Sequence, residues 1–311
     1  MRDGQILNIF PMHMRNRLAR TAQMTDDLRE LRFAAGQPVR VLCSVGERFL
    51  RITGELAMKE DEASWRITPG ELEQLLNHIC SYSRYAYEED IRQGFITLPG
   101  GHRAGVAGEV ILGEDGQVRN LKYIRYINIR ISHEIIGAAD NLMPYLHENG
   151  RLCNTLLVSP PGCGKTTMLR DLIRQISEGS RWARGRQVGV VDERSEIAGS
   201  FMGIPENRMG IRTDILDACP KVQGMMMLIR SMGPEVVAVD EIGSEQDLEA
   251  VRSILRCGCN VIATAHGASM EDAAGKGMDG RLFDRFVLLG KREGKYALLQ
   301  VLTREGEVLY A

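Results

Sequence analysis

The chain has 311 residues, 44% hydrophobic and 26% charged, a composition typical of a globular protein with room for one large domain or two medium ones. Its formal net charge of −2 does not give the basic footprint that a dedicated nucleic-acid binder needs. The sequence contains no run of about eighteen apolar residues, the length needed to cross a bilayer. Residues 1–20 also lack the apolar segment of a secretory signal, so we expect a cytoplasmic protein.

The cysteines predict reduced thiols rather than a disulfide framework, because their number is odd and their spacing irregular. They are Cys43, Cys80, Cys153, Cys163, Cys219, Cys257 and Cys259. The pair in "RCGCN" has no second Cys/His pair at a spacing suited to zinc, so we do not expect a metal site there.

Residues 1–131 have the pattern of a mixed α/β unit. Short apolar runs alternate with glycine-bearing turns over 28–56, as small paired strands do. The segment 68–94 predicts a helix with Thr68 as its N-cap and Pro69 as its first helical residue. An apolar stripe at helical spacing supports this helix and consists of Leu72, Leu75, Leu76 and Ile79.

Strands are predicted again over 95–111 and 121–132, joined by glycine-rich turns. Arg103 is expected to lie in one of these turns. The pattern changes shortly afterwards, so we expect a smaller α+β domain over 1–135 and a second domain over 136–311.

The second domain alternates strands with helices. Strands are predicted at 155–158, 188–191, 236–239 and 261–264, and helices at 167–178, 214–232 and 245–256. Nearly continuous apolar strands separated by helices indicate a parallel sheet that is covered on both faces, which is an α/β fold. The end of the chain predicts a strand meander with turns at 292–294 and 305–306.

The segment "LLVSPPGCGKTTMLRD", residues 156–171, nearly completes the phosphate-binding pattern G-x-x-x-x-G-K-[ST] between a strand and a helix. Ser159 replaces the first glycine, but it precedes a proline and is therefore expected to be extended, without a positive φ. Gly162 and Gly164 are expected to need a positive φ or a close approach to phosphate. The loop N–H groups and the helix dipole would hold the phosphates of ATP. The expected nucleotide-binding residues are Pro161, Gly162, Cys163, Gly164, Lys165, Thr166 and Thr167.

Two acidic residues follow a second buried strand. "EVVAVDEIG" ends in Asp240 and Glu241, about 75 residues after the loop. Lys165 would neutralise charge on the β- and γ-phosphates, and the Thr166 hydroxyl would ligate Mg²⁺. Asp240 would hold the magnesium through Thr166 and water, and Glu241 would orient or deprotonate the attacking water.

Two further strand ends supply candidates with open alternatives. "QVGVVDERSEI" contains Asp192 and Glu193, which form either a solvated strand end or a second acidic contribution to the water or metal site. "NVIATAHGAS" ends in His266, which either is structural or senses the γ-phosphate. A guanidinium from a neighbouring subunit often assists hydrolysis in this class. The arginines available for that role, each of which has an ordinary surface or structural alternative, are Arg103, Arg194, Arg208, Arg212 and Arg230.

Taken in order, "LPGGHRAGVAGEV", "SPPGCGKTTMLRDLIR", "VVDERSEI", "VVAVDEIGS" and "ATAHG" resemble the stage III sporulation protein AA family, which is itself similar to the hexameric ATPases of type II and type IV secretion systems. The resemblance covers nearly the whole chain. It implies a RecA-like P-loop NTPase core and a smaller α+β N-terminal domain similar to that of secretion ATPases. It also implies a homo-hexameric ring that hydrolyses ATP with Mg²⁺ and powers a membrane-embedded, secretion-like channel complex during endospore formation.

Carried over by position, the resemblance assigns Lys165 and Thr166 to Walker A, Asp240 and Glu241 to Walker B, Asp192 and Glu193 to the acidic "Asp box", and His266 to the "His box". Two departures accompany it. A serine stands at the first Walker A glycine, and "VVDERSE" and "ATAHG" are loose versions of the two boxes. The catalytic candidates are therefore Glu241, Glu193 and His266.

Two other functions compete with a ring ATPase. An ATP-regulated nucleic-acid-binding protein is the alternative, but the near-neutral charge and the 5% aromatic content argue against a nucleic-acid partner. A small-molecule kinase would need an acceptor pocket and an arginine-rich lid, and the sequence contains neither in recognisable form.

Overall fold

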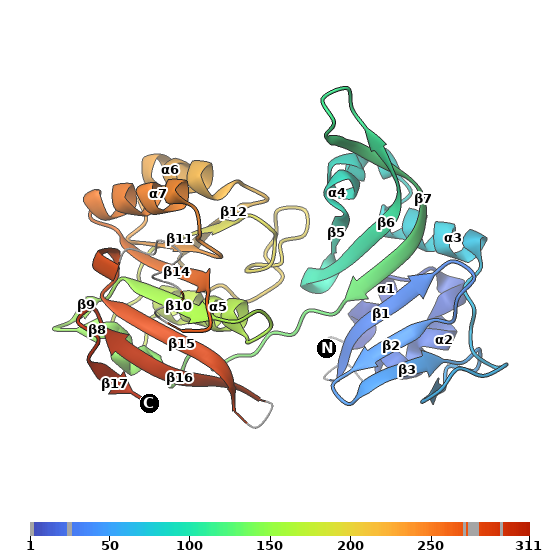
Figure 1. The fold of residues 1–311 in the computed structure, drawn as a ribbon, viewed down its shortest axis with the longest axis horizontal. Helices are drawn as coiled ribbons and strands as arrows, with labels where there is room; N and C mark the ends of the chain where they lie inside the picture. The colour runs from blue at the N-terminus through green and yellow to red at the C-terminus, as the bar shows by residue number, and fades with distance from the viewer. Residues whose placement is uncertain (1–2, 24–26, 270–271, 273–279, 293–294) are drawn as a thin grey trace. The chain divides into compact units, whose positions relative to one another are not determined.

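The computed structural model describes residues 3–23, 27–269, 272, 280–292 and 295–311. The chain divides into two compact units, Met1–His133 and Glu134–Ala311, called unit 1 and unit 2 below. Each unit has its own main sheet and its own hydrophobic core (Figure 1).

Unit 1 contains an antiparallel sheet with the strand order β4-β3-β2-β1-β7-β6-β5. Its strands are β1 (Leu28–Ala34), β2 (Arg40–Cys43), β3 (Gly46–Leu50), β4 (Leu56–Ala57), β5 (Phe95–Leu98), β6 (His102–Leu112) and β7 (Val118–Arg130). The helical segments are α1 (Asp3–Asn8), α2 (Met12–Ala22), α3 (Pro69–Ile79), η1 (Arg84–Tyr87), α4 (Glu88–Gln93) and η2 (Pro99–Gly101). Strands and helices share one core, so unit 1 is an α+β unit.

The start of α3 confirms the predicted N-cap, but the helix ends earlier than predicted. The Thr68 side chain accepts a hydrogen bond from the Glu71 N–H, Pro69 is the first helical residue, and the predicted apolar stripe is buried. The predicted helix over 68–94 is too long, because Ser81 and Tyr82 have φ values of 48° and 60° and turn the chain. The apolar stripe ends with α3, and the serines and tyrosines that follow are weaker helix formers.

Unit 2 contains an eight-stranded sheet with the order β12-β11-β13-β14-β10-β15-β16-β17. Its strands are β10 (Thr155–Ser159), β11 (Val188–Asp192), β12 (Thr213–Asp217), β13 (Val236–Val239), β14 (Asn260–His266), β15 (Arg285–Arg292), β16 (Lys295–Thr303) and β17 (Val308–Tyr310). The strands from β12 to β15 in this order pair in parallel, and β16 and β17 are added antiparallel. The predicted parallel sheet and C-terminal meander are confirmed, although part of the first predicted turn, residues 293–294, lies outside the described residues.

Helices cover both faces of this sheet (Figure 1). Apart from the small β8–β9 pair (His147–Glu148 and Arg151–Leu152), the other elements in the described part of unit 2 are α5 (Lys165–Glu178), α6 (Lys221–Ser231), α7 (Glu245–Arg256), η3 (Met143–Leu146) and η4 (Gly280–Leu282). Apolar residues of α5 pack in one core cluster, and those of α6 and α7 pack in another. The two clusters use alternating residues of the same strands, as expected for a sheet buried on both sides.

The prediction of a helix over 214–232 was wrong at its start. Residues Thr213–Asp217 form β12, an edge strand in register with β11, and α6 begins only after Pro220. The edge position explains the miss, because every β12 residue is only half-buried and the continuous apolar run that marks the central strands is lacking.

The parallel strands β10, β11, β13 and β14 all have their carboxyl ends on the same side of the unit 2 sheet. From β10 the chain passes to β11 and β12, returns through β13 and β14, and then adds β15 on the other side of β10. Ser159 at the end of β10 lies in register with His266 at the end of β14. The carboxyl ends of parallel strands beside such a reversal are where open α/β sheets bind ligands.

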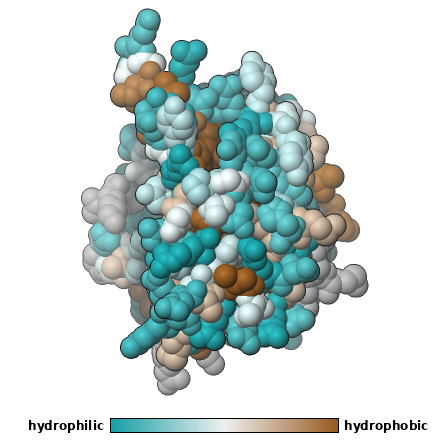
Figure 2. All heavy atoms as spheres, turned by 90° about the vertical axis from the view of Figure 1, so that its right-hand side faces the viewer, coloured by the Kyte–Doolittle hydropathy of each residue, from teal (hydrophilic) through white to brown (hydrophobic). Residues whose placement is uncertain are grey.

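The surface of the described residues is mixed in character. On the face shown in Figure 2, hydrophilic residues predominate and hydrophobic ones form small separate patches. Scattered exposure of this kind is ordinary for a folded protein. Among the described residues, none of the helices has both the length and the apolar character needed to cross a membrane.

Candidate functional site

The loop between β10 and α5 has the backbone conformation that the sequence predicts. Gly162 and Gly164 have φ values of 68° and 83°, whereas Ser159 is the buried, extended last residue of β10. A Cβ on Gly164 would lie 3.2 Å from Cγ of Tyr296, a tight contact that would push the Tyr296 ring aside by a few tenths of an ångström. Serine is therefore compatible with the first glycine position, because the chain there is still a strand.

Below the loop, the first turn of α5 meets the acidic end of β13. The Thr166 hydroxyl donates a hydrogen bond of 2.9 Å to Oδ2 of Asp240. The Thr264 hydroxyl of β14 donates to the other carboxylate oxygen, Oδ1. The Glu241 N–H contacts the same two groups, Asp240 Oδ1 at 3.0 Å and Thr264 Oγ1 at 2.9 Å. The structure thus brings Thr166 and Asp240 together and adds Thr264, which the sequence analysis did not single out.

The side chain of Glu241 lies among positively charged and imidazole groups. Its Oε1 is 3.5 Å from Nζ of the buried Lys165 and 2.9 Å from Nε2 of His266. Its Oε2 is 3.1 Å from Nη1 of Arg194. Partial burial would raise the pKa of Glu241, but Lys165, His266 and Arg194 outweigh it and hold that pKa below its usual value. Glu241 is therefore ionised at neutral pH and able to accept a proton or a hydrogen bond.

The two acidic residues at the end of β11 have different surroundings. Asp192 is buried and its carboxylate accepts three hydrogen bonds, from the N–H groups of Glu196, Ile197 and Ala198. Burial nevertheless raises its pKa to about 6. The Asp192 side chain thus organises the loop that follows β11.

Glu193 faces the start of α6 instead. Its Oε2 lies 3.3 Å from Nζ of Lys221, and its Oε1 is 3.4 Å from the Lys221 main-chain nitrogen. The same Lys221 Nζ donates a 2.9 Å hydrogen bond to the main-chain oxygen of Glu241. Lys221 is a second residue that the sequence analysis missed.

A small cavity lies between the ends of β11 and β13. Its volume is about 20 Å³, and it is lined by Asp192, Glu193, Arg194, Glu196, Asp240 and Glu241. A site needs roughly 10–15 Å³ and several polar partners to hold one water molecule. The cavity meets both conditions, and it places a candidate water position beside the Glu241 carboxylate.

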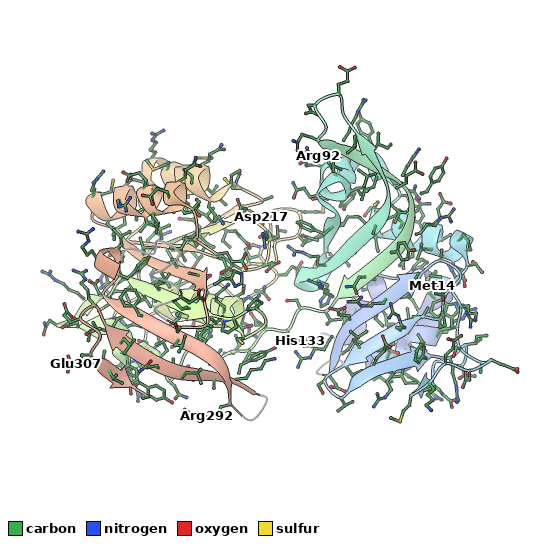
Figure 3. All side chains as sticks on the ribbon, in the orientation of Figure 1. Met14, Arg92, His133, Asp217, Arg292 and Glu307 are labelled. Atoms are coloured by element: carbon green, nitrogen blue, oxygen red, sulfur yellow. The ribbon has the colours of Figure 1, made fainter. Side chains whose placement is uncertain are left out.

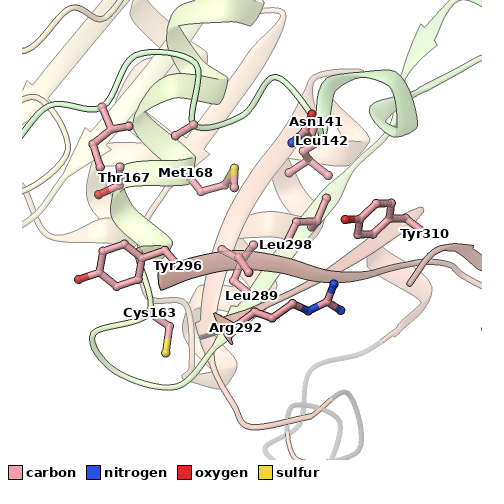
Figure 4. A pocket seen from close by; sticks show the side chains of 14 residues that line it. Asn141, Leu142, Cys163, Thr167, Met168, Leu289, Arg292, Tyr296, Leu298 and Tyr310 are labelled. Carbon is pink, nitrogen blue, oxygen red and sulfur yellow. The ribbon is translucent and has the colours of Figure 1, made fainter. Parts of the chain in front are cut away.

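A larger cavity of about 490 Å³ adjoins the opposite side of the loop (Figure 4). The loop and α5 contribute Gly164, Thr167 and Met168, and the C-terminal meander contributes Leu289, Tyr296 and Leu298. Its volume and its mixed apolar and polar lining are compatible with a small-molecule site. The sequence motif could indicate only the first three residues, because the others come from a strand pair with no motif of its own.

The five candidate arginines have different surroundings. Arg194 contacts Glu241, with Nη1 at 3.1 Å from Oε2. Arg212 donates to the main-chain oxygen of Ser177, which is a structural contact. Arg103 lies in β6 and not in the predicted turn, with its guanidinium 4.0 Å from the centroid of the Phe95 ring. The turn itself is Pro99–Gly101, whose two glycines have positive φ.

The remaining arginine candidates lie outside the Glu241 cluster, whereas Cys163 lies in the phosphate loop and lines the larger cavity. Arg208 lies in the segment between β11 and β12, where its N–H donates to Oε1 of Glu134, and Arg230 is exposed in the last turn of α6. All seven cysteines are free thiols. Within the described part of the chain, no group of three or more His, Cys, Asp or Glu side chains is arranged to hold a metal ion.

The fold is that of known secretion ATPases. The structure of the ATPase DotB from Legionella pneumophila matches with a TM-score of 0.57 at 16% identity, over 94% of this chain and 81% of that one. The pilus retraction motor PilT with bound ADP matches with a TM-score of 0.59 at 16% identity, over 94% of this chain and 82% of that one. The predicted α/β class with a RecA-like P-loop core is confirmed.

Residues 1–309 match the family described as "Sporulation stage III, protein AA", and the chain belongs to that family. Stage III sporulation protein AA of Bacillus subtilis (strain 168) is 39% identical over 312 residues, which are 98% of this chain and 97% of that protein. The uncharacterized protein ycf45 of Porphyra purpurea is 30% identical over 175 residues, which are 55% of this chain but 29% of that protein. The family resemblance deduced from the sequence is confirmed.

Proposed function

We propose that this protein is a Mg²⁺-dependent ATPase whose hydrolysis drives a secretion-like complex during endospore formation. One observation carries the proposal. Lys165 and Thr166 at the start of α5 contact Glu241 and Asp240 at the end of β13, at the sheet edge where such folds bind ligands. Membership of a sporulation family and the fold shared with secretion ATPases support the biological setting.

The triphosphate would bind over the residues from Pro161 to Thr167. The N–H groups at the start of α5 and the positive end of its dipole favour negative charge at this point. Lys165 is held 3.5 Å from the Glu241 carboxylate, an anion that a phosphate oxygen would replace. Nucleotide binding would therefore separate Lys165 from Glu241 and release the carboxylate for catalysis.

The donor set beside the loop suits Mg²⁺. A threonine hydroxyl and a carboxylate 2.9 Å apart are hard oxygen ligands, and magnesium completes its shell with phosphate oxygens and water. Thr166 and Asp240 would hold the ion, directly or through water. When bound, the ion would neutralise charge that develops on the phosphates. The Thr264 hydroxyl, bonded to Asp240, fixes the orientation of that carboxylate.

Glu241 would accept the proton of the attacking water or orient that water. The small cavity lined by Asp240 and Glu241 supplies the position, and the lowered pKa of Glu241 keeps the carboxylate ionised. His266, 2.9 Å from Glu241 and 3.4 Å from Lys165, would sense the γ-phosphate. Glu193 lines the same cavity and would also contribute through Lys221, with which it is ion-paired.

The cavity of about 490 Å³ would receive the nucleoside. It begins at Gly164 and Thr167, where the phosphate loop ends, and it presents the Tyr296 ring and aliphatic side chains to a planar base (Figure 4). The Arg292 guanidinium also lines it and would face the ribose or the phosphates.

We further propose that the active form is a homo-hexameric ring at the cytoplasmic face of a membrane, bound to the proteins of a channel complex. Residues 1–135 would act as an N-terminal domain of the secretion-ATPase kind, and 136–311 as the ATPase domain. Support comes from the family and from the shared fold.

Light scattering with ATP and Mg²⁺ tests the assembly, with Lys165→Ala as the matched control. The mass should increase to that of a ring when ATP and Mg²⁺ are added to wild type, and remain lower in Lys165→Ala. The proposal would be contradicted if wild type stayed monomeric and hydrolysed no ATP at protein concentrations well above the cellular one.

A further inference from the structure

The side chain of Lys221 connects two acidic segments of the site. Its Nζ donates a 2.9 Å hydrogen bond to the main-chain oxygen of Glu241 and lies 3.3 Å from Oε2 of Glu193. The Lys221 side chain is only 18% exposed, so its Nζ is largely shielded from water, whereas the Glu193 side chain is 39% exposed. Lys221 therefore joins the end of β11, the end of β13 and the start of α6.

The position of Lys221 on its helix is unfavourable for helix stability. It is the first residue of α6, directly after Pro220, where the positive end of the helix dipole disfavours a cation. The contacts with Glu193 and with the Glu241 carbonyl supply the compensating negative charge. The location is thus explained by the acidic site and not by α6 itself.

The main chain that Lys221 holds is strained. Glu241 has a φ of 53°, a left-handed conformation that costs free energy in a residue other than glycine. Its N–H is fixed by Thr264 and Asp240, and its carbonyl is fixed by Lys221. Because the side-chain direction follows from the backbone, these contacts decide whether the Glu241 carboxylate faces Lys165 and the small cavity.

We propose that Lys221 is a positioning residue for hydrolysis, which holds the strained backbone of Glu241 so that its carboxylate points at the attacking water. The proposal rests on the proposed function of Glu241. Glu193 then acts as the counter-ion that keeps Lys221 in place. Loss of the tether would let residues 240–244 relax, although the phosphate loop would stay intact.

The test compares Lys221→Met, which keeps the length and loses the charge, with Lys221→Arg, which keeps the charge. Lys122→Met is the matched control, because Lys122 is ion-paired with Glu109 in unit 1. Lys221→Met should lower kcat on the order of 10- to 100-fold with KM for ATP within about threefold of wild type. Lys221→Arg should recover most of kcat, and Lys122→Met should behave as wild type.

Two further measurements separate positioning from a general structural role. In a double-mutant cycle, Lys221→Met should add nothing to Glu241→Gln, since both act on one group. Hydrogen exchange without nucleotide should be faster over residues 240–244 in Lys221→Met and unchanged in Lys122→Met.

The proposal would be overturned if Lys221→Met had the kcat of wild type, or if its KM for ATP rose in parallel with the loss of kcat. Additive effects in the double-mutant cycle or unchanged hydrogen exchange over residues 240–244 would also overturn it. If Glu241→Gln retains full activity, the proposed function fails, and the exchange result alone then decides whether Lys221 holds the Glu241 backbone.

Discussion

The buried carboxyl of Asp192 predicts an unusual dependence of stability on pH. Its side chain is 2% exposed, and burial raises its pKa from 3.8 to about 6 despite three main-chain hydrogen bonds. Asp217, at the facing end of β12, has a pKa that burial also raises (Figure 3). The perturbation is Asp192→Asn, which keeps the size of the side chain and removes its titration.

The displacement of this pKa corresponds to about 3 kcal/mol of free energy of unfolding. Between pH 3.8 and about 6 the folded state retains a proton that the unfolded state has lost. The contribution of Asp192 is therefore largest in acid and is lost as pH rises through about 6. About 2 kcal/mol of it should disappear between roughly pH 4.5 and 7.5.

Urea unfolding of wild type and Asp192→Asn across this pH range measures the difference. The free energy of unfolding of wild type should fall relative to the variant as pH rises. Asp247→Asn is the control, because the pKa of Asp247 lies below its usual value of 3.8: burial opposes that shift, but the Ser244 and Gly243 N–H groups outweigh it. Asp247 therefore stays ionised in both states over this pH range, and the wild-type-to-Asp247→Asn difference should stay nearly constant. A wild-type-to-Asp192→Asn difference that stays constant or grows with pH would refute the reasoning.

Three further substitutions probe the phosphate loop and the metal ligands. Gly164→Ala combines a left-handed backbone with a Cβ 3.2 Å from the Tyr296 ring, so nucleotide affinity should fall by about tenfold or more, measured with a fluorescent ATP analogue. Gly162→Ala meets nothing within 4 Å and should lose less, and equal losses in the two variants would contradict the steric argument. Thr166→Val should raise the Mg²⁺ concentration needed for half-maximal hydrolysis about tenfold, and an unchanged requirement would count against Thr166 as a ligand.

Local patterns in the sequence were sufficient for the central strands and for the phosphate loop. The apolar runs of β10, β11, β13 and β14 are nearly continuous and buried, so their type and position follow from composition. A positive φ was among the expectations for the two loop glycines, and both have it. Edge elements were predicted less well, since half-buried β12 lacks the apolar signal of a central strand.

The residues that complete the site could not be found by local reasoning. Lys221, at the start of α6, contacts Glu241 after β13. Tyr296, in β16, lies beside Gly164 although more than a hundred residues separate them in the sequence. Thr264 had a faint signal, because it lies two residues before His266 on the same strand. Such contacts depend on the order of the strands, which apolar patterns do not specify.

The most direct measurement is a single-turnover assay of ATP cleavage by Glu241→Gln with Mg²⁺ present. The variant should bind ATP as tightly as wild type, and the rate at which γ-phosphate is released to water should fall on the order of 100-fold or more. Cleavage at the wild-type rate, or a parallel loss of ATP binding, would contradict the assignment of Glu241 as the group that acts on water.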